Sequence, residues 1–175
     1  ENVDLGKKWA DVLTVYDEKN PAHALRELTI RDDALTKEAV ACIAKMVTAS
    51  GITHLDLAGS ISKDSALAAL FDGFSTALKS GSPLPVISLN LTAAKFTQST
   101  LDFLAQNVKT LFPGMKELYL PNVSTPKAPP VASVLAGLAN LMVVDLSGLR
   151  IAKKSENELA PFLGGLVNLR ELHLQ

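Results

Sequence analysis

The side chains that could carry out covalent chemistry are few and scattered in this sequence. The only cysteine, Cys42, lies in a segment with helical periodicity, where a buried apolar thiol is expected more often than a nucleophile. The run Gly-Phe-Ser-Thr-Ala at 73–77 resembles a nucleophile elbow. It lies within an amphipathic helical stripe, however, and the elbow requires a sharp turn between a strand and a helix. Neither feature therefore predicts a catalytic residue.

The three histidines, His23, His54 and His173, are widely separated along the chain. The repeat described below places His54 and His173 on one face of a sheet but four strands apart, which is about 19 Å at roughly 4.8 Å per strand. One metal ion cannot bridge that distance. The sequence contains neither a phosphate-binding P-loop nor a dinucleotide-binding fingerprint. We therefore expect no enzyme activity, no metal site and no cofactor.

The composition is that of one domain with a core of aliphatic contacts. Of the 175 residues, 47% are hydrophobic but only 5% are aromatic, which is typical of stacked repeats. The net charge of −1 provides no positive surface for nucleic acid, and no apolar run reaches the ~18 residues that a membrane span needs. A single cysteine excludes an internal disulfide framework and favours a reducing, cytoplasmic setting.

The elements that must position the remaining polar side chains recur along the chain. The pattern Leu-x-x-Leu-x-Leu-x-x-Asn-x-Leu, with aliphatic substitutions, occurs five times and begins a sixth time. The steps between first positions are 27, 34, 29, 26 and 28 residues, long enough for a helix after each strand. The first and central aliphatic positions of the six copies are Leu25 and Leu28, Ile52 and Leu55, Val86 and Leu89, Met115 and Leu118, Leu141 and Val144, and Leu169 and Leu172.

The segments between these motifs have helical periodicity. In the strands, polar residues alternate with leucines, as in Leu28-Thr29-Ile30, so one face of the sheet is open to solvent. A doubly wound sheet is covered on both faces and would have continuous apolar strands. The pattern therefore predicts the α/β class, with a parallel sheet that helices cover on one face only. The helical stripes are Val40, Ile43 and Val47; Leu67, Leu70, Phe71, Phe74 and Leu78; Leu101, Leu104, Val108 and Leu111; Val131, Val134, Leu135 and Leu138; and Leu159, Phe162, Leu163 and Leu166.

These motifs resemble the leucine-rich repeat family, and the step of 26–29 residues is similar to its ribonuclease-inhibitor-like branch. That branch includes Ran GTPase-activating proteins, tropomodulins, CARMIL-type capping-protein regulators and NOD-like receptors. The resemblance covers residues 25–175 as about five and a half repeats. It implies a right-handed β–α superhelix, a horseshoe solenoid with the parallel sheet concave and the helices convex. Residues 1–24 would form an N-terminal helix, either a cap or the end of a preceding repeat. Because the last motif stops inside a strand, we expect the chain to be truncated at its C-terminus.

The sequence departs from the family pattern in two ways. The position usually held by Asn or Cys after each strand is Asp33, Ser60, Ala94, Val123 or Leu149. The last three cannot form the hydrogen bonds of Asn, so those turns must satisfy their backbone differently. The second repeat is also long, and its extra residues are predicted to form a loop at 79–85, Lys-Ser-Gly-Ser-Pro-Leu-Pro.

In a horseshoe, the two residues that flank each central aliphatic position line the concave face. Five of these twelve residues are acidic and none is Lys or Arg, so the face would attract a partner with a basic surface. Tyr119, central and amphipathic, is the best candidate for an anchor. The residues predicted to bind a partner are Glu27, His54, Asp56, Asn90, Glu117, Tyr119, Asp145, Glu171 and His173.

Other interpretations of this face and of the protein remain open. Any solvated sheet face needs polar residues, and the loop from Pro121 to Pro130 is a rival site. We expect a protein–protein interaction scaffold within a larger intracellular protein. The alternatives are a GTPase-activating or other regulator of a partner enzyme, and an extracellular recognition domain, which glycans on Asn90 or Asn122 would support. A monomer is expected, with a dimer through an edge strand as the alternative.

Overall fold

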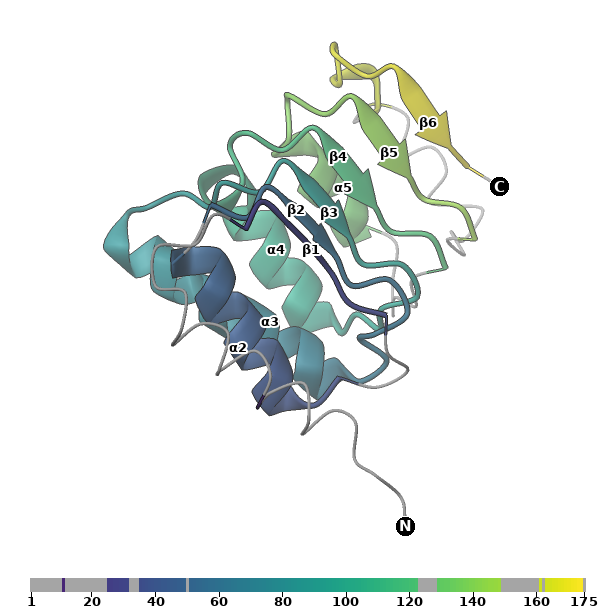
Figure 1. Ribbon diagram of the computed structural model, residues 1–175. Coiled ribbons are helices and arrows are strands. Elements are labelled where there is room, and N and C mark those ends of the chain that lie inside the picture. The colour runs from purple at the N-terminus through teal and green to yellow at the C-terminus, as the bar shows by residue number, and fades with distance from the viewer. Residues whose placement is uncertain are drawn as a thin grey trace.

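The computed structural model describes residues 11, 25–31, 35–49, 51–122, 129–148, 161 and 163–174. Six short strands in these ranges form one all-parallel sheet, and each strand pairs with the next along the chain (Figure 1). The strands are β1 (Glu27–Thr29), β2 (His54–Asp56), β3 (Ser88–Asn90), β4 (Glu117–Tyr119), β5 (Val143–Asp145) and β6 (Glu171–His173). The helices between them are α2 (Lys37–Ala49), α3 (Asp64–Ser80), α4 (Gln98–Leu111) and α5 (Pro129–Ala136).

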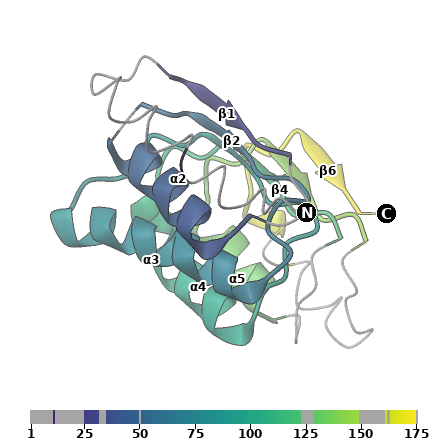
Figure 2. The same cartoon turned by 60° about the horizontal axis from the view of Figure 1, so that its bottom comes forward.

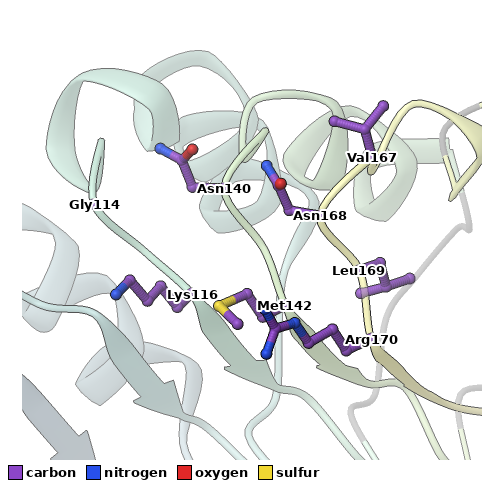
Figure 3. A pocket seen from close by; sticks show the side chains of 8 residues that line it. All are labelled: Gly114, Lys116, Asn140, Met142, Val167, Asn168, Leu169 and Arg170. Carbon is purple, nitrogen blue, oxygen red and sulfur yellow. The ribbon is translucent and has the colours of Figure 1, made fainter.

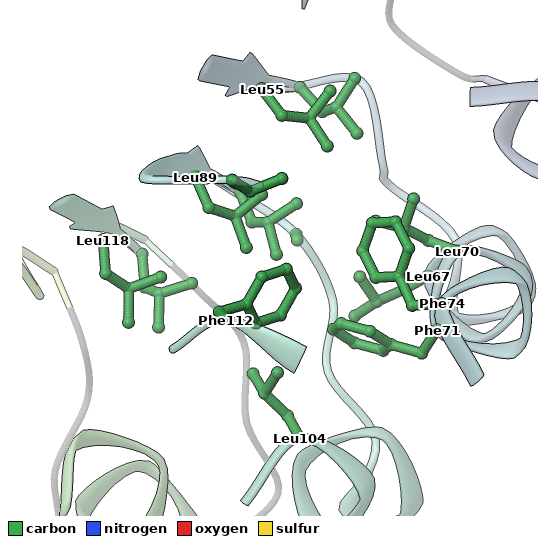
Figure 4. Packing of buried hydrophobic residues seen from close by; sticks show 14 of the residues in the cluster. Leu55, Leu67, Leu70, Phe71, Phe74, Leu89, Leu104, Phe112 and Leu118 are labelled. Atoms are coloured by element: carbon green, nitrogen blue, oxygen red, sulfur yellow. The ribbon is translucent and has the colours of Figure 1, made fainter. Parts of the chain in front are cut away.

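The central aliphatic residues of the strands form one continuous row. Its register runs through Leu28, Leu55, Leu89, Leu118, Val144 and Leu172, each paired with the next. This is the register that the repeat predicts, and it is confirmed. Figure 4 shows Leu55, Leu89 and Leu118 lying side by side, each with 2% or less of its surface exposed.

The helices lie together on one face of the sheet (Figure 2). The apolar stripes predicted for α2 and α4 are fully buried against it. Aromatic rings fill the space between the layers: the ring centroids of Phe71 and Phe74 are 6.3 Å apart, and those of Phe74 and Phe112 are 5.7 Å apart with edge-to-face geometry. The prediction of an α/β sheet covered by helices on one face is therefore confirmed.

A tight turn follows each inner strand and holds one residue in the left-handed region. That residue is the third after the strand in every case: Gly59 (φ 73°), Ala93 (φ 61°), Asn122 (φ 56°) and Gly148 (φ 70°). In the turn after β3, the Ala94 N–H donates to the Leu91 carbonyl at 3.0 Å. Such turns favour Gly or Asn at their third residue, so Ala93 is the strained member of the set.

These turns show how the backbone is satisfied where another residue replaces the usual Asn or Cys after a strand. The buried Ser60 donates from Oγ to the Ile30 carbonyl of the preceding repeat at 2.7 Å, which replaces the bond that Asn would make. Ala94 has no side-chain donor, and its N–H closes its turn just as the Ser60 N–H does by donating to the Leu57 carbonyl at 3.1 Å. The other three residues at this position, Asp33, Val123 and Leu149, lie outside the described residues.

The long second repeat differs from the sequence prediction. Lys79 and Ser80 belong to α3 and not to a loop, so part of the extra length is helical. The helix continues until Gly81, whose φ of 70° and N–H bond to the Leu78 carbonyl (3.1 Å) form a left-handed end. The Gly, Ser and Pro residues of 79–85 therefore correctly predicted the helix end at Gly81 and the loop after it, but Lys79 and Ser80 still belong to the last turn of the helix.

Four further details differ from the predicted core. Cys42 lies in α2 as predicted but is half-buried, and Leu138 is buried beyond the end of α5. Leu28 is half-buried and Leu172 is 39% exposed, because each lies on an end strand with a neighbour on one side only. The expected helix within residues 1–24, apart from Asp11, lies outside the described residues, as do Leu159 and Phe162 of the last helical stripe.

We predict that Leu118→Asp abolishes cooperative folding. The substitution removes about 1.5–3 kcal/mol of apolar burial and places an unpaired carboxylate between two rungs of the row. Thermal melting followed by circular dichroism measures the effect. The matched control is Leu172→Asp in the same row, which should melt nearly as the parent does. An unchanged melting temperature for Leu118→Asp would mean that its side chain does not face the core.

We predict that Ala93→Gly raises the free energy of unfolding by about 0.5–1 kcal/mol, because relief of left-handed strain exceeds the added chain entropy. The reciprocal control is Gly59→Ala, where no atom lies within 4 Å of an added Cβ, so the change reports backbone strain alone. Its stability should fall by a similar amount. Chemical denaturation checks both, and a destabilised Ala93→Gly would contradict the assigned turn.

Candidate functional site

The open face of the sheet carries two rows of side chains, one on each side of the buried aliphatic row. The strand register places all nine residues predicted to bind a partner on this face. Those on β2 to β5 are half-buried, whereas those on β1 and β6 are exposed. The first row is Glu27, His54, Ser88, Glu117, Val143 and Glu171, and the second is Thr29, Asp56, Asn90, Tyr119, Asp145 and His173.

Three members of the second row also hold the turns that follow their strands. Oδ1 of Asp56 accepts from the Ala58 N–H at 2.9 Å, and Oδ1 of Asp145 accepts from the Ser147 N–H at 2.8 Å. Asn90 does the same with Thr92 at 3.0 Å and also accepts from the Thr92 hydroxyl. Sequence reasoning missed this role. The sequence signal for this role is an Asp or Asn at the end of three strands, followed by Leu and then by a small residue.

The negative charge of this face is unevenly distributed. At the β1–β2 end, Arg31 forms an ion pair with Asp56 at 2.7 Å, and this arginine is the next outward residue after β1. The carboxylates of Glu117, Asp145 and Glu171 lie at the other end, on β4, β5 and β6. The acidic character predicted for the whole face is therefore concentrated on its second half.

Tyr119 lies within this acidic half. Its hydroxyl is 3.4 Å from Oε2 of Glu117. Burial raises the pKa of the Tyr119 phenol above its ordinary value of 10.0, and the carboxylates of Glu117, Glu171 and Asp145 raise it further. The phenol therefore stays neutral and donates its proton, while its ring stands in a negative field. An aromatic face bordered by carboxylates suits an ammonium or guanidinium group.

The two histidines that the structure describes, His54 and His173, do not come together. His54 contacts Thr53 through Nδ1 at 2.9 Å, and His173 lies 3.7 Å from Glu171. Their strands, β2 and β6, are separated by three others, as predicted, while residue 23 lies outside the described residues. Among the described residues, no group of three or more His, Cys, Asp or Glu side chains is arranged to hold a metal ion.

The segment that resembles a nucleophile elbow lies within α3. Ser75 is in the middle of the helix, and its Oγ donates to the Asp72 carbonyl at 2.6 Å. The glycine of this segment has a packing role, since a Cβ on Gly73 would collide with the Cβ of Ala44 where α2 and α3 approach each other. The glycine therefore permits close helix packing, and the segment lacks the strand-to-helix turn of an elbow.

A shallow pocket of about 520 Å³ lies near the starts of β4, β5 and β6 (Figure 3). Lys116 and Arg170 flank Met142 there, each just before its strand, and the two cations could contact an anionic group. The amides of Asn140 and Asn168 donate to carbonyls of the preceding repeat, at Pro113 (2.9 Å) and Ala139 (3.1 Å). Sequence reasoning missed this pocket, although the recurring Asn-Leu pair before β5 and β6 marks its rim.

The rival loop between Pro121 and Pro130 is described only at its ends, since residues 123–128 lie outside the described residues. In the part of the chain that the structure covers, no helix is both long and apolar enough to cross a membrane.

The fold and the open face define an α/β protein with one parallel sheet, whose strands follow the chain order and whose second face is covered by helices. The chain matches no protein-family model and no curated protein. Its structure is similar to a solved structure described as the tropomodulin C-terminal domain of Caenorhabditis elegans. That similarity has a TM-score of 0.49 at 12% sequence identity, over 99% of this chain and 83% of the other.

We predict that Glu117→Gln lowers the pKa of Tyr119, because the phenolate then forms without the negative charge and the hydrogen bond of Glu117. Ultraviolet absorbance of phenolate during an alkaline titration measures this. A parallel titration of Tyr119→Phe isolates Tyr119 from Tyr16, the only other tyrosine. Glu27→Gln on β1 is the control and should leave the curve unchanged. If the titration curve of Glu117→Gln overlays that of the parent, Glu117 does not raise the pKa of Tyr119, and the assigned contact between them is wrong.

Proposed function

We propose that this protein is a leucine-rich-repeat horseshoe that binds a protein partner through the concave face of its sheet. The partner presents a basic surface, and the complex forms in the cytoplasm, where the chain serves as a scaffold within a larger protein. The six in-register strands, their order and the placement of helices on one face support the solenoid geometry. The single cysteine supports the reducing compartment.

The observation that carries the proposal is the placement of Tyr119 among Glu117, Asp145 and Glu171. Tyr119 and Glu117 project from β4, and Asp145 and Glu171 from the next two strands of the sheet, so a partner would meet the charges in fixed positions. Rigid aromatic and charged anchors contribute most of the affinity in protein interfaces, and complementary charge adds association rate and specificity. The Arg31–Asp56 pair leaves the β1–β2 end less attractive to a cation.

The same geometry favours recognition over catalysis. Glu117 contacts the Tyr119 hydroxyl, and Asp145 holds a backbone turn, so both acids have positioning roles within the fold. Asn90 on the same face is half-buried and uses its Oδ1 to hold Thr92, which suits a sheet surface better than a glycan attachment point. We therefore favour an intracellular binding scaffold over the extracellular alternative.

We predict that neutralising the acidic half weakens binding of a cationic peptide without unfolding the chain. Glu117→Gln combined with Asp145→Asn removes two charges, and Asn retains the acceptor for the Ser147 N–H. The probe is a fluorescent lysine-rich peptide, and its affinity should fall by roughly tenfold at low salt. The charge-matched control is Glu38→Gln with Asp72→Asn, both exposed on helices, with binding near that of the parent.

Two outcomes would overturn the proposal. Equal loss of affinity in the helix control would mean that the peptide responds to net charge and not to the concave face. Acceleration of GTP hydrolysis by added chain, in a turnover assay against small GTPases, would replace the scaffold with the regulatory alternative. Circular dichroism melts of all variants ensure that neither result reflects unfolding.

A further inference from the structure

A row of residues lies directly before the strands, one position outside the first row of the open face. On β4, β5 and β6 its members are Lys116, Met142 and Arg170, which we call the pocket row because all three line the shallow pocket (Figure 3). The Met142 N–H donates to the Lys116 carbonyl at 2.7 Å, and the Arg170 N–H donates to the Met142 carbonyl at 2.8 Å. These bonds hold the two cations two strands apart, at about 10 Å between Cα atoms, with an apolar side chain between them.

Each cation of the pocket row is followed by a glutamate whose carboxylate is directed toward the second row of the open face. Oε2 of Glu117 accepts from the Tyr119 hydroxyl at 3.4 Å, and Oε2 of Glu171 lies 3.7 Å from Nε2 of His173. Among the residues that the structure describes, the side chains of the two cations form neither an ion pair nor a hydrogen bond. Their charges are therefore available to a ligand, although acids precede and follow them in space.

The equivalent positions on other strands show that an unused cation here is not a general feature of the repeat. Arg26 holds this position before β1, where its guanidinium donates to the Gly51 carbonyl at 3.0 Å, and part of its hydrogen-bonding capacity is used within the fold. Lys116 lies before β4, with β3 and β5 on its two sides, and its side chain is exposed. A cation at this position therefore reaches solvent even where a strand lies on each side of it.

The pocket is shaped around Met142. Figure 3 shows the Arg170 side chain running across the start of β5, so that its guanidinium lies beside Met142, with Asn140 and Asn168 on the opposite side of the pocket. The bonds from both asparagine amides to backbone carbonyls hold the segments before β5 and β6 in place. The Lys116 stem is flexible and exposed, so its ammonium can turn toward the same space. A guanidinium and an ammonium so placed can together donate several charge-assisted hydrogen bonds to an oxyanion.

We propose that this pocket binds an oxyanion of the protein partner, a carboxylate or a phosphate, between Arg170 and Lys116. That the oxyanion belongs to a protein rests on the proposed function, whereas the oxyanion site rests on the pocket row alone. Lys116 and Tyr119 are three residues apart, which is about 10 Å along β4 at roughly 3.3 Å per residue. The recognised segment is therefore bipolar, with a basic side chain on the acidic half and an anionic group in the pocket. A uniformly basic segment would place a cation beside Arg170, so this arrangement discriminates against it.

Titration with inorganic phosphate at constant ionic strength tests the pocket by itself. The readout is the nuclear magnetic resonance signal of the three methionine methyl groups, isotopically labelled. The Met142 signal, assigned with Met142→Leu, should shift as phosphate binds, because this side chain lies between the two cations. Met46 and Met115 are 2% and 1% exposed and are internal references. A Met142 signal that does not move, or equal shifts of all three signals, would overturn the proposal.

Removal of either cation tests which side chains hold the phosphate. Arg170→Gln and Lys116→Gln should each weaken the phosphate affinity, read from the Met142 signal, by roughly threefold or more. Lys79→Gln removes an exposed cation from the last turn of α3 and is the charge-matched control, with an affinity near that of the parent. An equal loss of affinity in this control would mean that phosphate responds to net charge, and the assigned site would be wrong.

Three fluorescent peptides test the class of ligand. Each carries a pair of lysines and, three residues further along, a glutamate, a phosphoserine or a glutamine. The parent should bind at least one anionic peptide roughly five- to tenfold more tightly than the glutamine peptide at low salt, and the tighter one identifies the source of the oxyanion. General attraction to the acidic half would favour the glutamine peptide instead, because it has the greater positive charge. Arg170→Gln should remove the preference, whereas Glu117→Gln should weaken all three peptides and preserve it.

The outcomes distinguish this proposal from the proposed function. If the glutamine peptide binds as tightly as both anionic peptides, the pocket does not select an oxyanion of the partner, and the proposal is overturned while the acidic half keeps its role. If no peptide binds but phosphate still shifts the Met142 signal, the proposed function fails and the protein partner with it, while the oxyanion site stands.

Discussion

The structure depends on one row of aliphatic side chains stacked from strand to strand. Leu55, Leu89, Leu118 and Val144 are almost completely buried, and each is in register with the next. Because side chains alternate across a strand, fixing this row toward the helices directs its two neighbours to the open face. The position of every residue of the candidate site is therefore a consequence of where the leucines pack.

The turns at the ends of the strands convert this row into a rigid surface. Three residues in the second row of the open face hold their turns through side-chain oxygens: Asp56, Asn90 and Asp145. A second set of backbone bonds joins successive turns, as between the Gly59 N–H and the Thr92 carbonyl at 2.9 Å. Asp56 and Asp145 are thus positioned by the same bonds that fix the repeat, which limits how far these two acids can move on binding.

Charge then divides a geometrically uniform face into two unlike halves. Arg31 pairs with Asp56 near the first strands, whereas the acids around Tyr119 raise the pKa of its phenol near the last. Neighbouring rungs are equivalent in backbone geometry, so this difference arises entirely from side-chain identity. It is what allows a repetitive scaffold to have one preferred contact area and not a uniform surface.

The sequence by itself determined the α/β class, the strand register and the face on which each polar residue lies, because aliphatic periodicity is a local signal that packing must obey. Only the tertiary structure decided how far α3 extends, since Gly81 and not composition ends the helix. Only it showed that Leu172 lies exposed on an end strand while Leu118 is buried, and that Asp56 is paired and Glu117 borders Tyr119. The Arg31–Asp56 pair joins residues 25 positions apart, and the exposure of Leu172 depends on the neighbours of its whole strand, so no short pattern in the chain records either feature. The contact of Glu117 with Tyr119 and the end of α3 at Gly81 are local in sequence, but they depend on side-chain and backbone conformations that the residue types alone do not fix.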